Sequence, residues 1–121
     1  IMSGGTLRQI SEDHSYVEEM RRLGRISEAD ARSHPQKNLI TRAVGVDATV
    51  DGDLFEQTLA DGDILLLCSD GLTNAVPKEQ LEQLLCTGKF YDLPDLLIRT
   101  ANENGGPDNI TALLLCVEEV R

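Results

Sequence analysis

The sequence is poor in basic residues and has no long apolar run. Of its 121 residues, 11 are Lys or Arg and 21 are Asp or Glu, so the formal net charge is −10 at pH 7. Binding to nucleic acid depends on clustered positive charge, and this balance argues against a nucleic-acid partner. No apolar stretch approaches the ~20 residues that span a bilayer, so this segment is not expected to contact a membrane.

Cysteine is also scarce, and its spacing excludes two kinds of site. Cys68, Cys86 and Cys116 are too far apart for a zinc motif, and an odd count gives no disulfide framework. Cys68 and Cys116 each end an apolar run and are expected to be small buried side chains. A reducing cytoplasm is the simplest setting for such cysteines. The first five residues also lack the basic and apolar regions of a signal peptide.

What remains is an ordinary globular composition, with 40% hydrophobic and 26% charged residues. The length suits one domain or part of a larger one. Helical spacing predicts helices over residues 16–23, 27–32, 78–85 and 92–101. Ser15 is the expected N-cap of the first helix, and Ser27 with Asp30 suggests a capping box for the second.

Apolar runs predict strands over residues 4–10, 39–46, 50–59, 64–68 and 110–117. The runs at 64–68 and 110–117 are continuous, as in strands that are buried on both faces. Turns separate the strands, which favours an antiparallel or mixed sheet with the two later helices over one face. The fold class is therefore α+β, and one face of the sheet has no obvious partner layer in the chain.

Two aspartates stand beside the most apolar strands. Asp70 follows the run at 64–68, and Asp108 precedes the run at 110–117. If these strands are antiparallel neighbours, the two carboxylates meet at one edge of the sheet. Paired carboxylates suit Mg²⁺ or Mn²⁺, and they would repel each other without a cation between them. Each Asp can equally be a turn residue, because both stand next to or near glycine.

Two other places in the sequence invite a chemical interpretation. Asp13, His14 and Ser15 contain the residue types of a hydrolase triad, but adjacent side chains point in different directions and cannot form one. A solvated His14 in a helix-capping turn is the simpler interpretation. Arg42 lies among apolar neighbours and could bind an anion or pair with a nearby acid.

Five segments together resemble one family, the metal-dependent protein serine/threonine phosphatases of the PPM, or type 2C, class, and its bacterial branch in particular. They occur in the family's order and cover nearly the whole chain. The matching segments are SEDHS at 11–15, the stretch at 24–38, ITRAVG at 40–45, DILLLCSDGL at 63–72 and GPDNIT at 106–111.

The resemblance implies a β-sandwich flanked by helices in α-β-β-α layers, with mostly antiparallel strands. It covers only the C-terminal half of the family's domain, so the sandwich is incomplete without the N-terminal half. Residues 1–121 are accordingly expected to be the C-terminal portion of a single phosphatase catalytic domain, with a helical flap at about 15–38.

The resemblance also implies hydrolysis of phosphoserine and phosphothreonine by a metal-activated water, with two Mn²⁺ or Mg²⁺ ions in the complete domain. Asp70 and Asp108 match positions that bind one of these ions, and no catalytic residue is assigned beyond the metal ligands. Gly71 and Asn109 match residues that support the metal loop. The implied partners are phosphorylated proteins, with a cognate Ser/Thr kinase and its substrates.

The departures from the family matter as much as the matches. The family's earlier acidic ligands, including the Asp that bridges the two ions, and its phosphate-binding Arg have no counterpart here. The chain is therefore interpreted either as a piece of an active phosphatase, inactive alone, or as a non-catalytic half-domain that acts as a binding or regulatory module. A first residue other than Met favours the first interpretation. An open apolar sheet is also expected to drive self-association.

Overall fold

The computed structural model describes residues 1–106 and 108–119. The chain forms two compact units. The first, here called the sheet unit, combines Ile1–Ile10 with Thr58–Arg121, and the second, here called the helical unit, is Ser11–Gln57. The sheet unit is thus built from two separate stretches of sequence, with the helical unit inserted between them.

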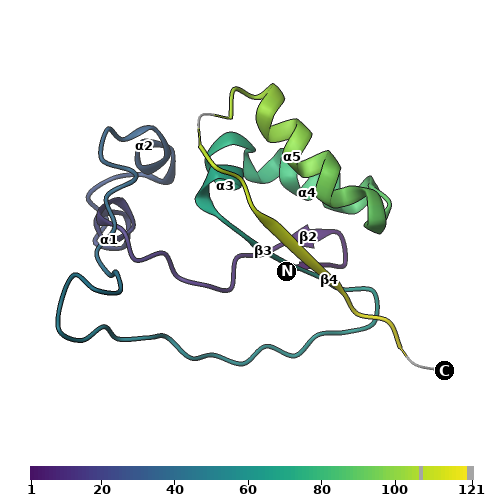
Figure 1. The fold of residues 1–121 in the computed structure, drawn as a ribbon, viewed down its shortest axis with the longest axis horizontal. Coiled ribbons are helices and arrows are strands. Elements are labelled where there is room, and N and C mark those ends of the chain that lie inside the picture. Colours follow the sequence, from purple (N-terminus) through teal and green to yellow (C-terminus); the bar gives the residue numbers. More distant parts are fainter. Residues whose placement is uncertain (107, 120–121) are drawn as a thin grey trace. The chain divides into compact units, whose positions relative to one another are not determined.

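The sheet unit contains an antiparallel sheet in the order β2-β1-β3-β4 (Figure 1). The strands are β1 (Met2–Ser3), β2 (Thr6–Leu7), β3 (Ile64–Cys68) and β4 (Ala112–Cys116). The longest pairing joins β3 to β4, from Ile64 opposite Cys116 to Cys68 opposite Ala112. This pairing confirms the antiparallel α+β arrangement and the prediction that these two strands are neighbours.

Helices cover one face of this sheet (Figure 1). They are α3 (Asp70–Ala75), α4 (Lys78–Thr87) and α5 (Leu93–Glu103), and a short 3₁₀ turn, η1 (Phe90–Asp92), leads into α5. Pro94 lies in the first turn of α5, where its missing N–H costs no helical hydrogen bond. Helices α4 and α5 were predicted. Helix α3 was not, because its first residues were interpreted as a turn.

The core lies between these helices and the sheet. The largest side chains there that are almost completely excluded from solvent are those of Leu72, Val76, Leu93 and Leu97. From the sheet, Ile64, Leu66, Ala112 and Leu114 pack against the same cluster. Because side chains alternate along a strand, the residues between these face the other side of the sheet.

That other side, here called the leucine face, is open in the sheet unit. Leu65 pairs with Leu115 and Leu67 pairs with Leu113 across β3 and β4. Leu67, Leu113 and Leu115 are each about half exposed, at 48%, 57% and 52%. The prediction that both strands are buried on both faces is therefore wrong, since helices cover only one face. Cys68 is exposed and Cys116 half-buried, so the prediction of two buried thiols is also wrong.

The helical unit contains α1 (Tyr16–Arg22) and α2 (Glu28–Ser33), close to their predicted bounds. The Ser15 hydroxyl accepts the Glu18 N–H at the start of α1. Ser27 and Asp30 form the predicted capping box at the start of α2. Among the described residues, no helix is both long enough and apolar enough to cross a membrane.

Residues 39–59 form no strand, so the strands predicted at 39–46 and 50–59 are wrong. Their one ladder contact is a single bridge from Ile40 to Ser15. A β-strand is stable only when a neighbour pairs with its backbone, and within the described residues no strand pairs with this stretch. Its apolar side chains consequently remain in solvent, with Val44 90% and Leu54 100% exposed.

A side chain of α4 occupies the free edge of strand β2. The Arg8 N–H pairs with the Ile1 carbonyl, so the preceding N–H, that of Leu7, points away from β1. That N–H donates to Glu82 Oε2 over 2.8 Å. The carboxylate of a helix thereby satisfies a backbone donor that an edge strand would otherwise leave open.

Candidate metal centre

Strand pairing brings the two candidate ligands to the same edge of the sheet. Because Cys68 lies opposite Ala112, the end of β3 is adjacent to the start of β4. Asp70 follows β3 by two residues and is the first residue of α3. Asp108 precedes β4 by four residues. The loops that carry them therefore lie side by side, as the sequence predicted for antiparallel neighbours.

Hydrogen bonds join the two loops directly. The Ser69 N–H donates to the Thr111 carbonyl over 3.0 Å. In return, the Thr111 N–H donates to the Ser69 hydroxyl over 3.0 Å, and that hydroxyl contacts the Asn109 carbonyl at 3.3 Å. Ser69 immediately precedes Asp70, and Asn109 immediately follows Asp108. These bonds therefore fix the backbones that carry the two carboxylates relative to each other.

The predicted supporting residues, Gly71 and Asn109, lie in contact with each other. A Cβ atom added to Gly71 would lie 2.1 Å from the Asn109 carbonyl oxygen. Only a residue without a side chain permits this approach. The Asn109 N–H also donates to Asp108 Oδ1 over 2.7 Å, which orients that carboxylate. The remaining residue of this loop, Pro107, lies outside the described residues.

Both carboxylates are exposed, and their chemistry suits a hard cation. Carboxylate oxygens are the usual ligands of Mg²⁺ and Mn²⁺, which retain several water molecules when few protein ligands are present. No cluster of three or more His, Cys, Asp or Glu side chains suited to a metal ion occurs within residues 1–106 and 108–119. Asp70 and Asp108 are therefore two candidate ligands, and within the described residues no third such side chain is grouped with them.

The helical unit contains a separate cluster of charged side chains, in which the predicted pairing of Arg42 with an acid occurs but the partner, Asp53, was not foreseen. His14 Nε2 lies 2.7 Å from Asp53 Oδ2, and Arg42 NH1 lies 3.1 Å from Asp53 Oδ1. The hydrogen bond to His14, followed by that to Arg42, holds the pKa of Asp53 below its usual value. His14 is therefore paired, and Arg42 binds an acid. No local pattern could reveal Asp53, which lies 39 residues from His14.

A second carboxylate serves the sheet unit. Asp63 is buried, and its Oδ2 accepts the Ala60 N–H over 2.8 Å. Hydrogen bonds from Ser3, and then from the Ala60 N–H, hold the pKa of Asp63 below its usual value. Asp63 thus ties the turn before β3 to strand β1 and is a structural residue.

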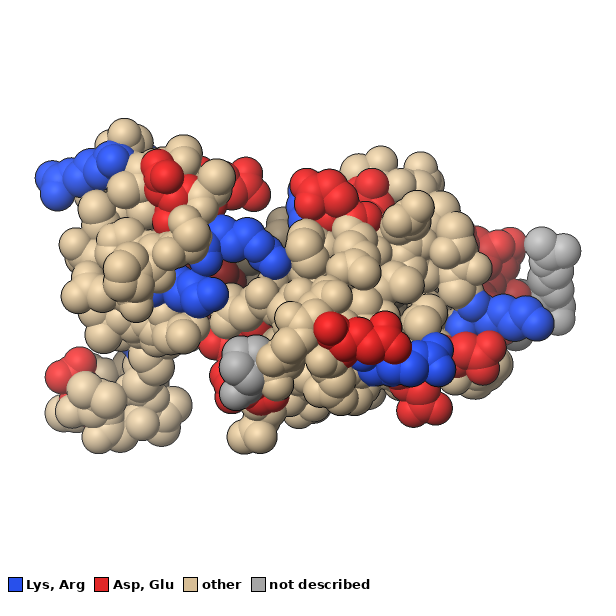
Figure 2. Space-filling model, turned by 90° about the horizontal axis from the view of Figure 1, so that it is seen from above, with Lys and Arg blue, Asp and Glu red and all other residues tan. Residues whose placement is uncertain are grey.

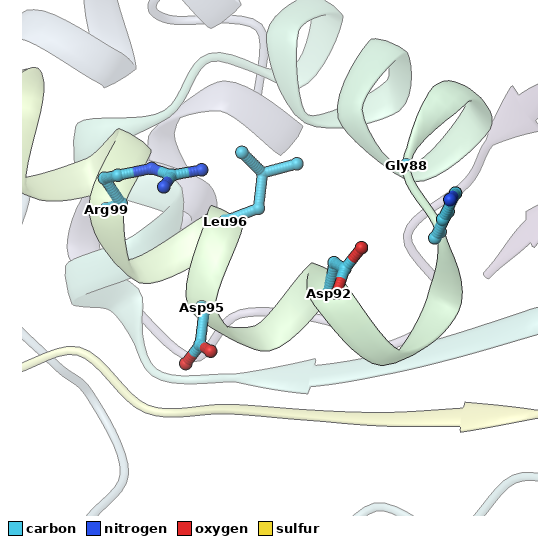
Figure 3. Close-up of a pocket in the computed structure, with 6 residues that line it drawn as sticks. Gly88, Asp92, Asp95, Leu96 and Arg99 are labelled. Carbon is cyan, nitrogen blue, oxygen red and sulfur yellow. The ribbon is translucent and has the colours of Figure 1, made fainter.

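A pocket of about 450 Å³ lies between the end of α4 and α5, and the loops that carry Asp70 and Asp108 do not line it (Figure 3). Its lining combines acidic and basic groups, which are Lys89, Asp92, Asp95 and Arg99 with Gly88 and Leu96. Figure 3 shows the Arg99 side chain beside Leu96, while Asp95 points away from them. Neither Asp70 nor Asp108 lines this pocket, so the pocket is separate from the candidate metal site.

Charges of opposite sign are mixed over the surface. On the face seen in Figure 2, Lys and Arg side chains lie beside Asp and Glu side chains. In the helical unit, for example, Arg21 Nε donates to Glu18 Oε2 over 2.9 Å, and Arg22 pairs with Glu12. The hydrogen bond from Arg21 holds the pKa of Glu18 below its usual value.

Comparison with known proteins relates the chain to bacterial phosphatases, although no family model matches it. It is 47% identical to serine/threonine phosphatase stp of Listeria welshimeri over 116 residues, which are 95% of this chain and 46% of that protein. It is 36% identical to protein phosphatase PhpP of Streptococcus pneumoniae over 120 residues, 98% of this chain and 49% of that protein.

Solved structures agree. The Mycobacterium tuberculosis serine/threonine phosphatase PstP/Ppp superposes with a TM-score of 0.90 and 36% identity, covering 98% of this chain and 50% of that one. Stp1 from Staphylococcus aureus gives a TM-score of 0.90 with 39% identity, covering 94% and 45%. A PstP catalytic domain solved with two manganese ions gives a TM-score of 0.85 with 32% identity, covering 98% and 48%.

The fold and the sequence thus relate the chain to bacterial serine/threonine phosphatases, one of which is the PPM phosphatase MsPP of Mycobacterium smegmatis, and this confirms the resemblance drawn from the motifs. More particularly, the relatives are the bacterial phosphatases named Stp, PhpP and PstP. The chain spans about half the length of these relatives.

Proposed function

We propose that this chain is part of a protein serine/threonine phosphatase that depends on Mn²⁺ or Mg²⁺, and that it corresponds to the C-terminal half of the catalytic domain. The observation that carries the proposal is the pairing of Cys68 with Ala112, which brings the Asp70 and Asp108 loops together. The names of the relatives support the activity, and the two manganese ions of the PstP structure support the metal.

In this proposal, Asp70 and Asp108 hold one ion, and Gly71 and Asn109 keep their loops in contact. When bound, Mn²⁺ or Mg²⁺ would supply Lewis-acid chemistry and a water that is nucleophilic at neutral pH. The whole of residues 1–121 belongs to one catalytic domain, and the helices α1 and α2 form a flap at about 15–38.

Two carboxylates alone leave most coordination positions of an ion to water. The isolated chain is therefore expected to bind Mn²⁺ weakly and to show little phosphatase activity. A non-catalytic binding or regulatory module is the second candidate. The observation that favours it is that no third ligand accompanies Asp70 and Asp108 within the described residues.

Calorimetric titration of the chain with Mn²⁺ tests the metal site. Weak binding is expected in the wild-type chain, and its loss is expected in Asp70→Asn and in Asp108→Asn. Asp47→Asn is the matched control, because Asp47 is an exposed aspartate of the helical unit. Tight binding of two ions, or binding that survives both substitutions, would show that the proposed ligands are wrong.

The proposed substrates are phosphorylated proteins, which a cognate serine/threonine kinase must supply. The names of the relatives support this class of substrate. The proposed compartment is the cytoplasm. None of the three cysteines forms a disulfide, which suits a reducing environment.

We also propose that the leucine face mediates self-association of the isolated chain. Its paired leucines form a contiguous apolar surface along β3 and β4. Exposed apolar patches of this kind favour association, because burying them removes apolar area from water.

A further inference from the structure

One hydroxyl group lies at the junction of the two ligand loops. Ser69 Oγ accepts the Thr111 N–H over 3.0 Å and lies 3.3 Å from the Asn109 carbonyl oxygen, to which it donates. A serine hydroxyl has one proton to donate and can accept at the same time. The proton and one of the two lone pairs of Ser69 Oγ are therefore used on the backbone that follows Asp108.

The two chain neighbours of Asp70, which are Ser69 and Gly71, both contact the carbonyl group of Asn109. Ser69 precedes Asp70 and bonds to the Asn109 carbonyl, and Gly71 follows it and approaches the same carbonyl too closely for any Cβ. Asn109 in turn adjoins Asp108 and donates its N–H to that carboxylate. Contacts with Asn109 thus fix the backbone position of Asp70, and Asn109 also orients the Asp108 carboxylate.

We propose that Ser69 is a positioning residue of the metal centre, whose hydroxyl sets the separation of the Asp70 and Asp108 carboxylates. This inference rests on the proposed function. In this inference Ser69 acts through the backbone, because its hydroxyl bonds two backbone groups of the loop that follows Asp108. Its contribution is to hold the two carboxylates at a fixed separation, so that one ion can bind both at the same time.

Loss of the hydroxyl has a defined cost. In Ser69→Ala, the Thr111 N–H and the Asn109 carbonyl both lose a partner, and the loops are held less tightly, although the Ser69 N–H still donates to the Thr111 carbonyl. Residues that orient metal ligands typically change metal affinity by about 10–100-fold when they are replaced. We expect Mn²⁺ binding to weaken by about tenfold or more, because the ligands no longer share one geometry.

The test is nuclear magnetic resonance of the intact chain during titration with Mn²⁺, which broadens the amide signals near the bound ion. In the wild-type chain, the Gly71 and Asn109 signals should broaden at the same Mn²⁺ concentration. In Ser69→Ala, broadening should require about tenfold more Mn²⁺. In Ser69→Ala, the Thr111 amide hydrogen should also exchange faster with solvent, because it loses its bond to the hydroxyl. Hydrogen exchange measured without Mn²⁺ detects this change.

Two matched pairs of variants separate the hydroxyl from side-chain shape. Ser69→Thr keeps the hydroxyl and should behave as wild type. Ser69→Val has the shape of Ser69→Thr without the hydroxyl and should behave as Ser69→Ala. This comparison holds even if Ser69→Ala proves unstable. Ser33→Ala removes a hydroxyl that bonds the Ala29 carbonyl within α2, and it should change neither measurement.

The outcomes distinguish the inference from the proposed function. Absence of Mn²⁺ broadening at both loops of the wild-type chain would contradict the metal site itself. Broadening of both loops that is equal in wild type, Ser69→Ala and Ser69→Val would retain the metal site and overturn the role of Ser69. Failure of Ser69→Thr to match wild type would likewise show that the hydroxyl is not the determinant.

Discussion

Replacing Gly71 by alanine should both destabilise the sheet unit and weaken Mn²⁺ binding. The added Cβ would lie 2.1 Å from the Asn109 carbonyl oxygen and 3.0 Å from the carbonyl carbon. Ordinary contacts of a Cβ begin near 3.4 Å, so the oxygen must move by about 1.3 Å (3.4 − 2.1). The obstacle is backbone, which cannot rotate away as the end of a side chain can.

The displacement has two consequences. Forcing an extra methyl group into a packed site typically costs ~1–3 kcal/mol of stability. Asn109 also accepts the Ser69 hydroxyl at its carbonyl and donates its N–H to Asp108, so its movement should separate the two carboxylates. Urea unfolding measures the first effect, and Mn²⁺ titration measures the second.

Gly52→Ala provides the control. No atom lies within 4 Å of a Cβ added there, and the position needs no left-handed backbone. Its stability should be unchanged or raised by up to about 1 kcal/mol, because alanine restricts the unfolded chain. The steric argument is refuted if Gly71→Ala matches Gly52→Ala in both assays.

Three further predictions concern the core, the charged cluster and the leucine face. Leu97→Ala should lower the free energy of unfolding by ~2–5 kcal/mol in urea, because Leu97 is fully buried. The lowered pKa of Asp53 stabilises the folded state above about pH 4, and this contribution is lost as the pH falls through the folded pKa. Asp53→Asn should therefore show a shallower acid-side loss of helicity than the control Glu19→Gln; an equal loss would contradict the pairing. Leu113→Ser should weaken self-association in sedimentation velocity, whereas Leu54→Ser, at a fully exposed leucine, should not.

The sequence was most informative where burial and pairing coincide. The apolar runs around Leu66 and Leu114 predicted β3 and β4, and their antiparallel pairing then placed Asp70 beside Asp108. This step needed no knowledge of side-chain geometry. It rested on the condition, which the structure confirms, that the two strands are antiparallel neighbours, because in such a pair the end of one strand adjoins the start of the other.

Helix α3 was missed because its first residues favour turns. Ser69, Asp70 and Gly71 together are typical of a turn, and the helix has only six residues. A usable signal was present in Leu72 and Ala75, which are three residues apart and both pack in the core. Such spacing places both side chains on one helical face.

The errors over residues 39–59 have a different cause. Residues such as Val44 and Val46 favour strands, but strand propensity reflects packing and pairing more than any property of the backbone. Without a paired neighbour, they remain exposed. Likewise, no local signal could show that Asp53 bonds His14 and Arg42, because that contact depends on how the chain folds back.

The hydrogen bond from the Leu7 N–H to Glu82 determines which edge of the sheet can accept a further strand. With that N–H occupied, a further strand cannot pair fully along β2. At the opposite edge, β4 pairs only with β3 within the residues that the structure describes. An extended peptide that joined this sheet by β-augmentation would therefore add beside β4. Leu113 and Leu115 would then select apolar side chains at alternate positions of the incoming strand.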